Sequence, residues 1–169
     1  LTIHGANWIV FKTNSSINIQ LKKLVPKLTL LMFLLTIATI YLWINYLNGS
    51  FENLAKYPFL LIFPLMVLLA IIGLFFSNRF KNDGYGFLFS SLFIIGSLST
   101  TAASLFPIFL PSSNTINPSL SIYNTGINDY GYEIGFKWWI VAIILVVLYF
   151  VIQHKFFKGK LDEIDYGHH

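Results

Sequence analysis

The sequence predicts an all-α integral membrane protein with four complete transmembrane helices and the end of a fifth. The first observation is composition: of 169 residues, 56% are hydrophobic and 11% are charged, and the mean hydropathy is +0.68. About a quarter of the residues in a soluble domain are charged, and a soluble core of this size could not bury so much apolar surface. The other two observations are uncharged runs of membrane-spanning length and basic residues that gather on one side of them.

Four apolar runs reach the length of about 20 residues that a helix needs to cross about 30 Å of hydrocarbon. These predicted transmembrane helices cover residues 28–47, 59–76, 87–110 and 138–156. Barrel strands are excluded because they alternate polar and apolar residues, and lipid offers no partner for unpaired backbone groups. Residues 1–13 are apolar but short, so we expect the end of a truncated transmembrane helix there. The chain shows no initiator methionine and no signal peptide, which agrees with truncation.

The basic residues divide the connections into two classes. Nine of the eleven lie on one side of the predicted spans: Lys12, Lys22, Lys23, Lys27, Arg79, Lys81, Lys155, Lys158 and Lys160. By the positive-inside rule this side is cytoplasmic, so the tail at 157–169 is predicted inside and the loop at 111–137 outside. No basic stripe accompanies a polar, foldable domain, which argues against nucleic acid as a partner. The absence of cysteine excludes disulfides and thiolate metal ligands.

Prolines and turn signals shape the connections. Residues 14–27 alternate apolar with polar and basic side chains, as a short cytoplasmic interfacial helix would, and Pro26 is expected to break it before the first complete span. Residues 111–137 contain Pro-Ser-Ser, Asn-Pro and Gly-Ile-Asn-Asp turn signals, so we expect an ordered external cap. Pro64 is expected to kink the second span.

Ionisable side chains are missing from the interiors of the predicted spans, through Ile152 in the last one. Such groups cost about 2.5–3.5 kcal/mol at mid-bilayer and are usually kept there for function. Neither a relay of ionisable groups nor a pair of axial histidines can be built from these helices alone. We therefore predict no catalytic, cofactor-binding or metal-binding residue in this chain.

Each histidine has an ordinary interpretation. His4 is the only one near hydrocarbon, and a lone histidine near a helix end is more often hydrogen-bonded to a neighbour than a haem ligand. His154 lies at the cytoplasmic boundary, while His168 and His169 end the chain as tail or tag residues. Two of the four share no helical face and two lie at the chain end, so a metal site is not expected.

The third span is rich in small residues. Gly96, Thr100 and Ser104 recur at four-residue spacing, and Ser97 and Thr101 form an adjoining stripe. Helices approach closely through such faces, so packing is the favoured interpretation and a polar path for protons or quinol is the alternative. Tryptophan and tyrosine residues near the span ends are typical of membrane-interface anchors. They are Trp8, Trp43, Trp138, Trp139, Tyr41, Tyr46, Tyr57 and Tyr149.

Two sequence blocks carry a resemblance, HGANWIVFKT at His4–Thr13 and LFPIFLPSSNTINPSLSIYN at Leu105–Asn124. They are similar to subunit II of cytochrome bd-type quinol oxidases, in which a helix ends in Gly-Ala, an aromatic residue and a basic-Thr pair, and a later helix runs into Phe-Pro and Pro-Ser-Ser. FLFSS at Phe87–Ser91 and the pair Trp138-Trp139 follow in the matching order, so the resemblance covers nearly the whole chain. Family members are longer, and this chain resembles their C-terminal half. The residues after Asn124 depart from the family pattern, so the external turn is expected to differ locally.

The resemblance implies one half of a pseudo-symmetric helical-bundle subunit in the bacterial cytoplasmic (inner) membrane. Subunit II carries no haem; it supports subunit I, which holds haem b and haem d and couples quinol oxidation to the reduction of oxygen to water in the respiratory chain. Small single-span accessory subunits, the quinol pool, lipid and a structural quinone are further expected partners. In that family, residues of the N-terminal half help to form a proton path. Half of a multi-spanning transporter and an assembly scaffold without a redox role remain the alternatives.

Overall fold

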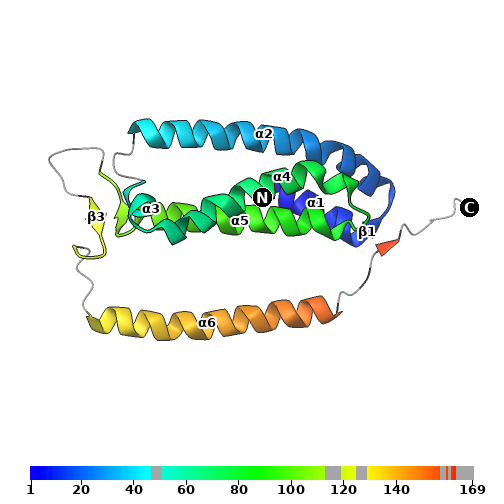
Figure 1. Cartoon of the computed structure of the whole chain (residues 1–169). Coiled ribbons are helices and arrows are strands. Elements are labelled where there is room, and N and C mark those ends of the chain that lie inside the picture. The colour runs from blue at the N-terminus through cyan, green and yellow to red at the C-terminus, as the bar shows by residue number, and fades with distance from the viewer. Residues whose placement is uncertain (47–50, 113–118, 125–128, 157–158, 160, 163–169) are drawn as a thin grey trace, which may run out of the picture. The chain divides into compact units, whose positions relative to one another are not determined.

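The structure is a computed structural model of the chain, and it describes residues 1–46, 51–112, 119–124, 129–156, 159 and 161–162. The chain forms two compact units, one of Leu1–Phe106 with Lys160–His169 and the other of Pro107–Gly159. Figure 1 shows both, and each unit is described by itself.

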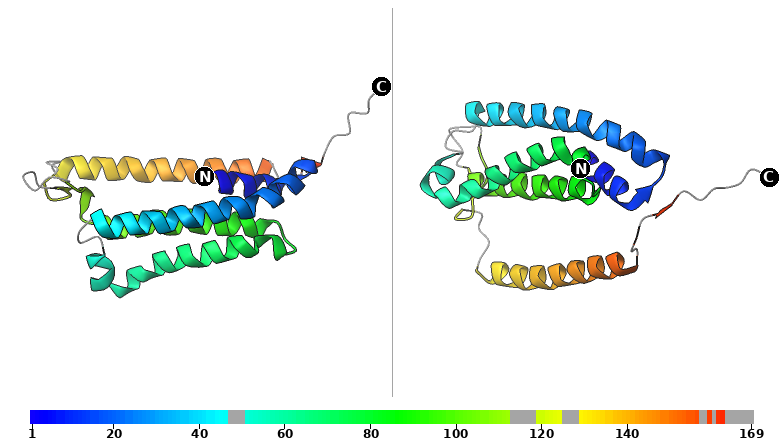
Figure 2. Two further views of the ribbon diagram at one scale, coloured as in Figure 1. Left: turned by 90° about the horizontal axis from the view of Figure 1, so that it is seen from above. Right: turned by 45° about the vertical axis from the view of Figure 1, so that its right-hand side comes forward.

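Helices dominate the first unit. In chain order it contains α1 (Thr2–Lys12), the short strand β1 (Thr13–Asn14), α2 (Ser16–Tyr46), α3 (Glu52–Lys56), the 3-10 turn η1 (Pro58–Leu61), α4 (Ile62–Phe76), the 3-10 turn η2 (Ser77–Arg79) and α5 (Gly84–Leu105). The α4–α5 pair makes the most extensive helix contact, α1 packs on α5 and α2, and α2 also contacts α4. The views in Figure 2 agree that α2, α4 and α5 run side by side. A two-residue strand near the chain end, β4 (Leu161–Asp162), pairs in parallel with β1.

The second unit has a small hairpin and one long helix. Strand β2 (Ile108–Leu110) pairs antiparallel with β3 (Leu120–Ser121), and an irregularity lies between Ile108 and Leu110. Helix α6 (Asp129–Phe156) follows. Its residues are apolar all round between Trp138 and Ile152, a composition typical of a membrane-spanning helix.

Four helical stretches are long and apolar enough to cross a membrane: Ser16–Tyr46, Pro58–Arg79, Gly84–Leu105 and Asp129–Phe156. Along α2, large apolar side chains such as Leu31, Leu34 and Leu35 are more than half exposed within the first unit. So large an apolar surface is unfavourable in water and suits a lipid environment. The predicted class, an all-α integral membrane protein, is confirmed.

The structure corrects the prediction at Pro26. We expected this residue to break the interfacial helix at 14–27, but α2 continues through Pro26 from Ser16 to Tyr46. A proline inside a helix removes one amide donor and leaves the carbonyl four residues earlier without its helical partner. That carbonyl belongs to Lys22, and it accepts a hydrogen bond from Asn78 Nδ2 at 2.7 Å. A side chain of a neighbouring element thus replaces the missing donor.

Two predicted span boundaries also need correction. The helix expected at 87–110 ends at Leu105, because Phe106 precedes Pro107 and takes an extended conformation with ψ at 135°. The next three residues form β2. The helix expected at 138–156 instead begins at Asp129, so part of the predicted external loop at 111–137 is helical. Residues 113–118 and 125–128 of that loop, Leu47 of the first span and most of the tail at 157–169 lie outside the described residues.

Candidate functional site

A groove lies between α1, α2, α4 and α5 in the first unit, with a volume of about 270 Å³. Most of its lining is apolar, and the polar groups His4 and Ser90 lie within it. The remaining lining residues are Leu1, Thr2, Ile3, Leu28, Leu31, Met32, Leu35, Leu74, Phe93 and Ile94. The groove is therefore mainly apolar, with Thr2, His4 and Ser90 as its polar residues.

His4 is hydrogen-bonded across the α1–α5 contact, as the sequence predicted for a lone histidine. Its Nδ1 lies 2.9 Å from Ser90 Oγ, and the Ser90 hydroxyl donates to the Phe87 carbonyl at 2.9 Å. A serine hydroxyl has a single proton. When Ser90 donates that proton to the Phe87 carbonyl, His4 Nδ1–H must be the donor to Ser90 Oγ. In the neutral ring, Nε2 then carries the lone pair.

The groove residues do not fit haem. His4 and Met32 both line the groove and would be possible axial ligands. However, about 270 Å³ is below the roughly 300–1,000 Å³ typical of pockets for drug-sized ligands and cofactors. Among the described residues there is no group of three or more His, Cys, Asp or Glu that could hold a metal ion.

Aromatic rings fix α1 on α5 beside the groove. The Phe87 ring lies 4.6 Å from the His4 ring and 5.0 Å from the Trp8 ring, measured between centroids, and it stacks with Phe11 at 6.3 Å. Lys12 Nζ lies 5.2 Å from the Trp8 ring centroid, within cation–π range. The cluster places Trp8 beside a basic residue at the end of α1, which is the setting of an interfacial anchor.

The small-residue stripe of α5 packs against α4. A Cβ added at Gly96 would lie 3.0 Å from Val67 Cγ2 and 3.2 Å from the Phe63 carbonyl oxygen, so the glycine permits the close approach. The neighbouring hydroxyls are bonded within α5 itself: Thr100 donates to the Gly96 carbonyl at 2.7 Å and Thr101 to the Ser97 carbonyl at 3.0 Å. This arrangement favours the packing interpretation over a polar path.

The other aromatic and histidine residues do not converge on the groove. Trp43 belongs to α2, and its Nε1 is buried without a hydrogen-bond partner among the described residues. Trp138 and Trp139 belong to α6, and His154 lies in the last turn of that helix. His168 and His169 lie outside the described residues.

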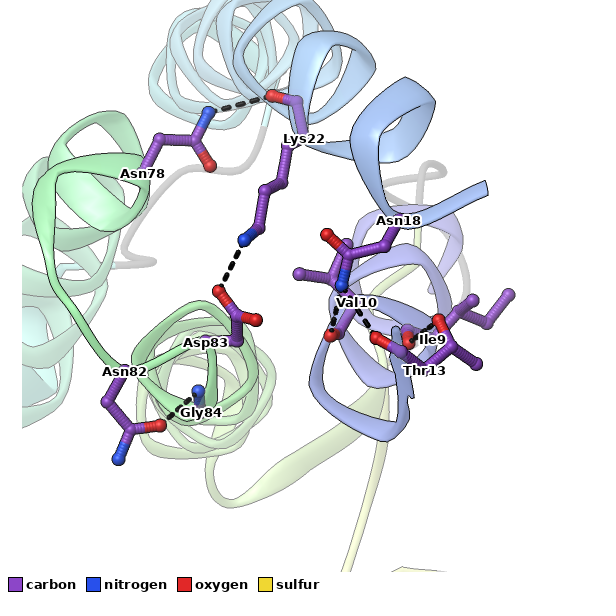
Figure 3. Close-up of polar contacts among 9 residues, drawn as sticks. All are labelled: Ile9, Val10, Thr13, Asn18, Lys22, Asn78, Asn82, Asp83 and Gly84. Atoms are coloured by element: carbon purple, nitrogen blue, oxygen red, sulfur yellow. Dashed lines mark hydrogen bonds and ion pairs between the residues drawn. The ribbon is translucent and has the colours of Figure 1, made fainter. Parts of the chain in front are cut away.

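A set of polar contacts joins the elements at the α1–α2 end of the first unit, where α1 meets α2 and η2 leads into α5 (Figure 3). Asn18 Nδ2 donates to the Val10 and Thr13 carbonyls, each at 2.8 Å, and so satisfies the end of α1. Lys22 Nζ lies 2.6 Å from Asp83 Oδ1. Sequence reasoning missed these contacts, although Pro26 signals that the Lys22 carbonyl needs a partner.

The comparisons with known proteins agree with this architecture. A family model described as "Cytochrome bd terminal oxidase subunit II" matches residues 1–157. The chain belongs to this family. A curated relative from Haemophilus influenzae (strain ATCC 51907 / DSM 11121 / KW20 / Rd), named "Probable cytochrome oxidase subunit 2", is 26% identical over 188 aligned residues. That alignment covers 96% of this chain and 50% of the relative, so the chain spans about half the length of the protein it matches.

The family match confirms the family that the blocks at His4–Thr13 and Leu105–Asn124 indicated. Both blocks lie inside the matched range of residues 1–157. The four membrane-length helices are those of a multi-pass membrane protein.

Proposed function

We propose that this chain is the C-terminal half of the haem-free subunit II of a quinol oxidase. In this role it supports a haem-bearing subunit I, which holds haem b and haem d, oxidises quinol and reduces oxygen to water. The chain contributes scaffold and membrane surface, and the redox centres belong to its partner.

One observation carries this proposal: the membrane-length helices are apolar through their interiors, and the one histidine beside them is engaged within the bundle. His4 Nδ1 is hydrogen-bonded to Ser90 Oγ across α1 and α5, and the hydroxyls of Thr100 and Thr101 donate within α5. Ionisable side chains inside a membrane are expensive and mark functional sites. Their absence from the interiors of the four predicted spans is what we expect of a supporting subunit.

We further propose that the α1–α2 end faces the cytoplasm of a bacterial inner membrane. Lys12, Lys22 and Lys23 lie at this end, and η2 there contains Arg79. This end of the first unit therefore collects positive charge from two separate connections, as the positive-inside rule requires.

The test is purification through an affinity tag on this subunit in its complete oxidase, from membranes of a host that lacks other oxidases. We expect a haem-bearing polypeptide and the absorption band of haem d in the same fraction, and loss of that band from membranes when the gene is deleted. Return of the gene restores the band. A deletion strain that keeps both the band and quinol-dependent oxygen uptake would refute the proposal and would favour the transporter or scaffold alternative.

A further inference from the structure

Two prolines leave backbone carbonyls of α2 and α5 without helical donors. The two carbonyls lie near opposite ends of the segment 53–78, which contains α4 and is called the α4 segment below. Pro26 lies inside α2, so the Lys22 carbonyl four residues earlier has no amide to accept from. Pro107 lies two residues after Leu105, the last residue of α5, and the carbonyl four residues before it belongs to Ala103. The hydrogen bond to the Lys22 carbonyl is exposed, so a side-chain donor there takes a place that water could partly fill.

An asparagine side chain reaches each of these carbonyls. Asn78, in η2 just after α4, donates from Nδ2 to the Lys22 carbonyl at 2.7 Å. Asn53, in α3 just before the α4 segment, donates from Nδ2 to the Ala103 carbonyl at 3.1 Å and also to the Phe106 carbonyl. The two donors lie on opposite sides of α4 in the sequence. The Lys22 carbonyl and the Ala103 carbonyl each lie four residues before a proline, whereas the Phe106 carbonyl lies beyond the end of α5.

We propose that Asn53 and Asn78 donate the hydrogen bonds that the two prolines cannot donate. Asn53 thereby joins the start of the α4 segment to α5, and Asn78 joins its end to α2; each such contact is called a latch below. Each latch joins helices that are far apart in the sequence, by 50 residues for Asn53 and Ala103 and by 56 for Asn78 and Lys22. The proline supplies the free acceptor and the asparagine supplies the donor, so each pair works only as a unit.

Lys22, whose carbonyl accepts from Asn78, makes a second contact through its side chain. Lys22 Nζ pairs with Asp83 Oδ1 at 2.6 Å, next to the start of α5, as Figure 3 shows. Lys22 is thus held through its backbone by η2 and through its side chain by Asp83. Asn18, one turn earlier in α2, continues the connection to the end of α1. The part of α2 before Pro26 is therefore held by contacts with η2, with Asp83 and with the end of α1.

The decisive test is a double-mutant cycle between Asn78→Ala and Pro26→Ala in the complete oxidase purified in detergent. The readout is hydrogen–deuterium exchange of peptides that cover residues 16–30. With Pro26 present, we expect Asn78→Ala to speed exchange there by about two- to tenfold. This is the change in an opening equilibrium that follows from the loss of one hydrogen bond that water can partly replace. In the Pro26→Ala background, a backbone amide takes over the Lys22 carbonyl, and Asn78→Ala should then change exchange by less than twofold.

Two control variants isolate the latch. Asn82→Ala removes a local hydrogen bond, which the Gly84 amide donates to Asn82 Oδ1 at 2.8 Å. This variant should leave hydrogen–deuterium exchange at residues 16–30 unchanged. Asn78→Asp keeps the side-chain shape but cannot donate when ionised, so it should behave as Asn78→Ala. Equal effects of Asn78→Ala with and without Pro26, or no effect in either background, would overturn the proposal.

The pair at the other end of α4 gives an independent measurement if the Pro26 variants do not assemble. Asn53 is partly buried, so we expect Asn53→Ala and Asn53→Asp to lower the midpoint temperature of heat denaturation of the complex, both by several °C. An Asn53→Asp complex with the wild-type midpoint would show that donation to Ala103 is not needed, and it would overturn the proposal at this end.

Discussion

Replacement of Gly96 by alanine tests whether the small-residue stripe of α5 is a packing face. The added Cβ would lie 3.0 Å from Val67 Cγ2, 3.2 Å from Met66 Cβ and 3.2 Å from the Phe63 carbonyl oxygen. Carbon atoms in ordinary contact are about 3.5–4.0 Å apart. The Val67 methyl can rotate away, but Met66 Cβ and the Phe63 carbonyl move only with the α4 backbone. The two helices must therefore separate by a few tenths of an ångström.

The expected cost is the difference between two effects. Overpacking of a close contact costs about 1–3 kcal/mol. Alanine favours a helix over glycine by roughly 0.5–1 kcal/mol, which offsets part of that cost. We expect a net loss of about 1 kcal/mol for Gly96→Ala and a larger loss for Gly96→Val, which adds two more methyl groups to the same contact. The control is Gly5→Ala in α1, where an added Cβ meets no described atom within 4 Å.

The assay is the midpoint temperature of heat denaturation of the purified oxidase, followed for this subunit by immunoblot of the soluble fraction. A loss of about 1 kcal/mol lowers the midpoint by roughly 2–4 °C for a domain of this size. The order of stability should be Gly5→Ala and wild type above Gly96→Ala, and Gly96→Ala above Gly96→Val. If Gly96→Ala and Gly96→Val match the Gly5→Ala control, the stripe does not pack as the structure shows, and the polar path becomes the better interpretation.

Three further predictions concern single contacts. Gly73→Ala would place a Cβ 2.3 Å from Phe89 Cδ1, so we expect destabilisation that Phe89→Leu relieves in the double variant, as measured by the same midpoint; an unrelieved loss would mean that another neighbour is responsible. Thr100→Val removes a hydroxyl that, among the described residues, donates to the Gly96 carbonyl of its own helix. Quinol-dependent oxygen uptake should therefore stay within twofold of wild type, whereas a tenfold loss would point to a polar path. Glu133→Gln should leave stability unchanged, because the Lys137–Glu133 pair is exposed by 69% and 63%; a midpoint shift of several °C would contradict this.

Composition and hydropathy were enough to predict the fold class, because a lipid solvent restricts the solutions to helices that satisfy their own backbone. The hydrogen bonding of His4 and the packing role of Gly96 followed from general expectations about lone histidines and small residues. Boundaries were harder to predict. Hydropathy continues through Phe106 to Leu110, yet Pro107 ends α5 at Leu105, so the local rule for the residue before proline outweighed the apolar pattern.

Pro26 shows the opposite failure, in which a local rule was applied and tertiary structure overrode it. The sequence places a proline after a short amphipathic stretch, which ordinarily ends a helix. The structure keeps the helix because Asn78, 56 residues from Lys22, supplies the missing donor. Such a partner cannot be assigned from one sequence without the fold. The rule that proline releases the carbonyl four residues earlier would nevertheless have directed a search to Lys22.

The most direct test of the central claim, that this chain holds no redox centre, is the haem content of the complete oxidase with His4→Asn and His154→Ala combined. The asparagine amide can still donate to Ser90 in place of Nδ1, while both imidazole rings are removed. The haem content per complex and the absorption bands of haem b and haem d should equal those of the wild type. Loss of one haem, or a shift in one of these bands, would contradict the account and make one of these histidines a ligand.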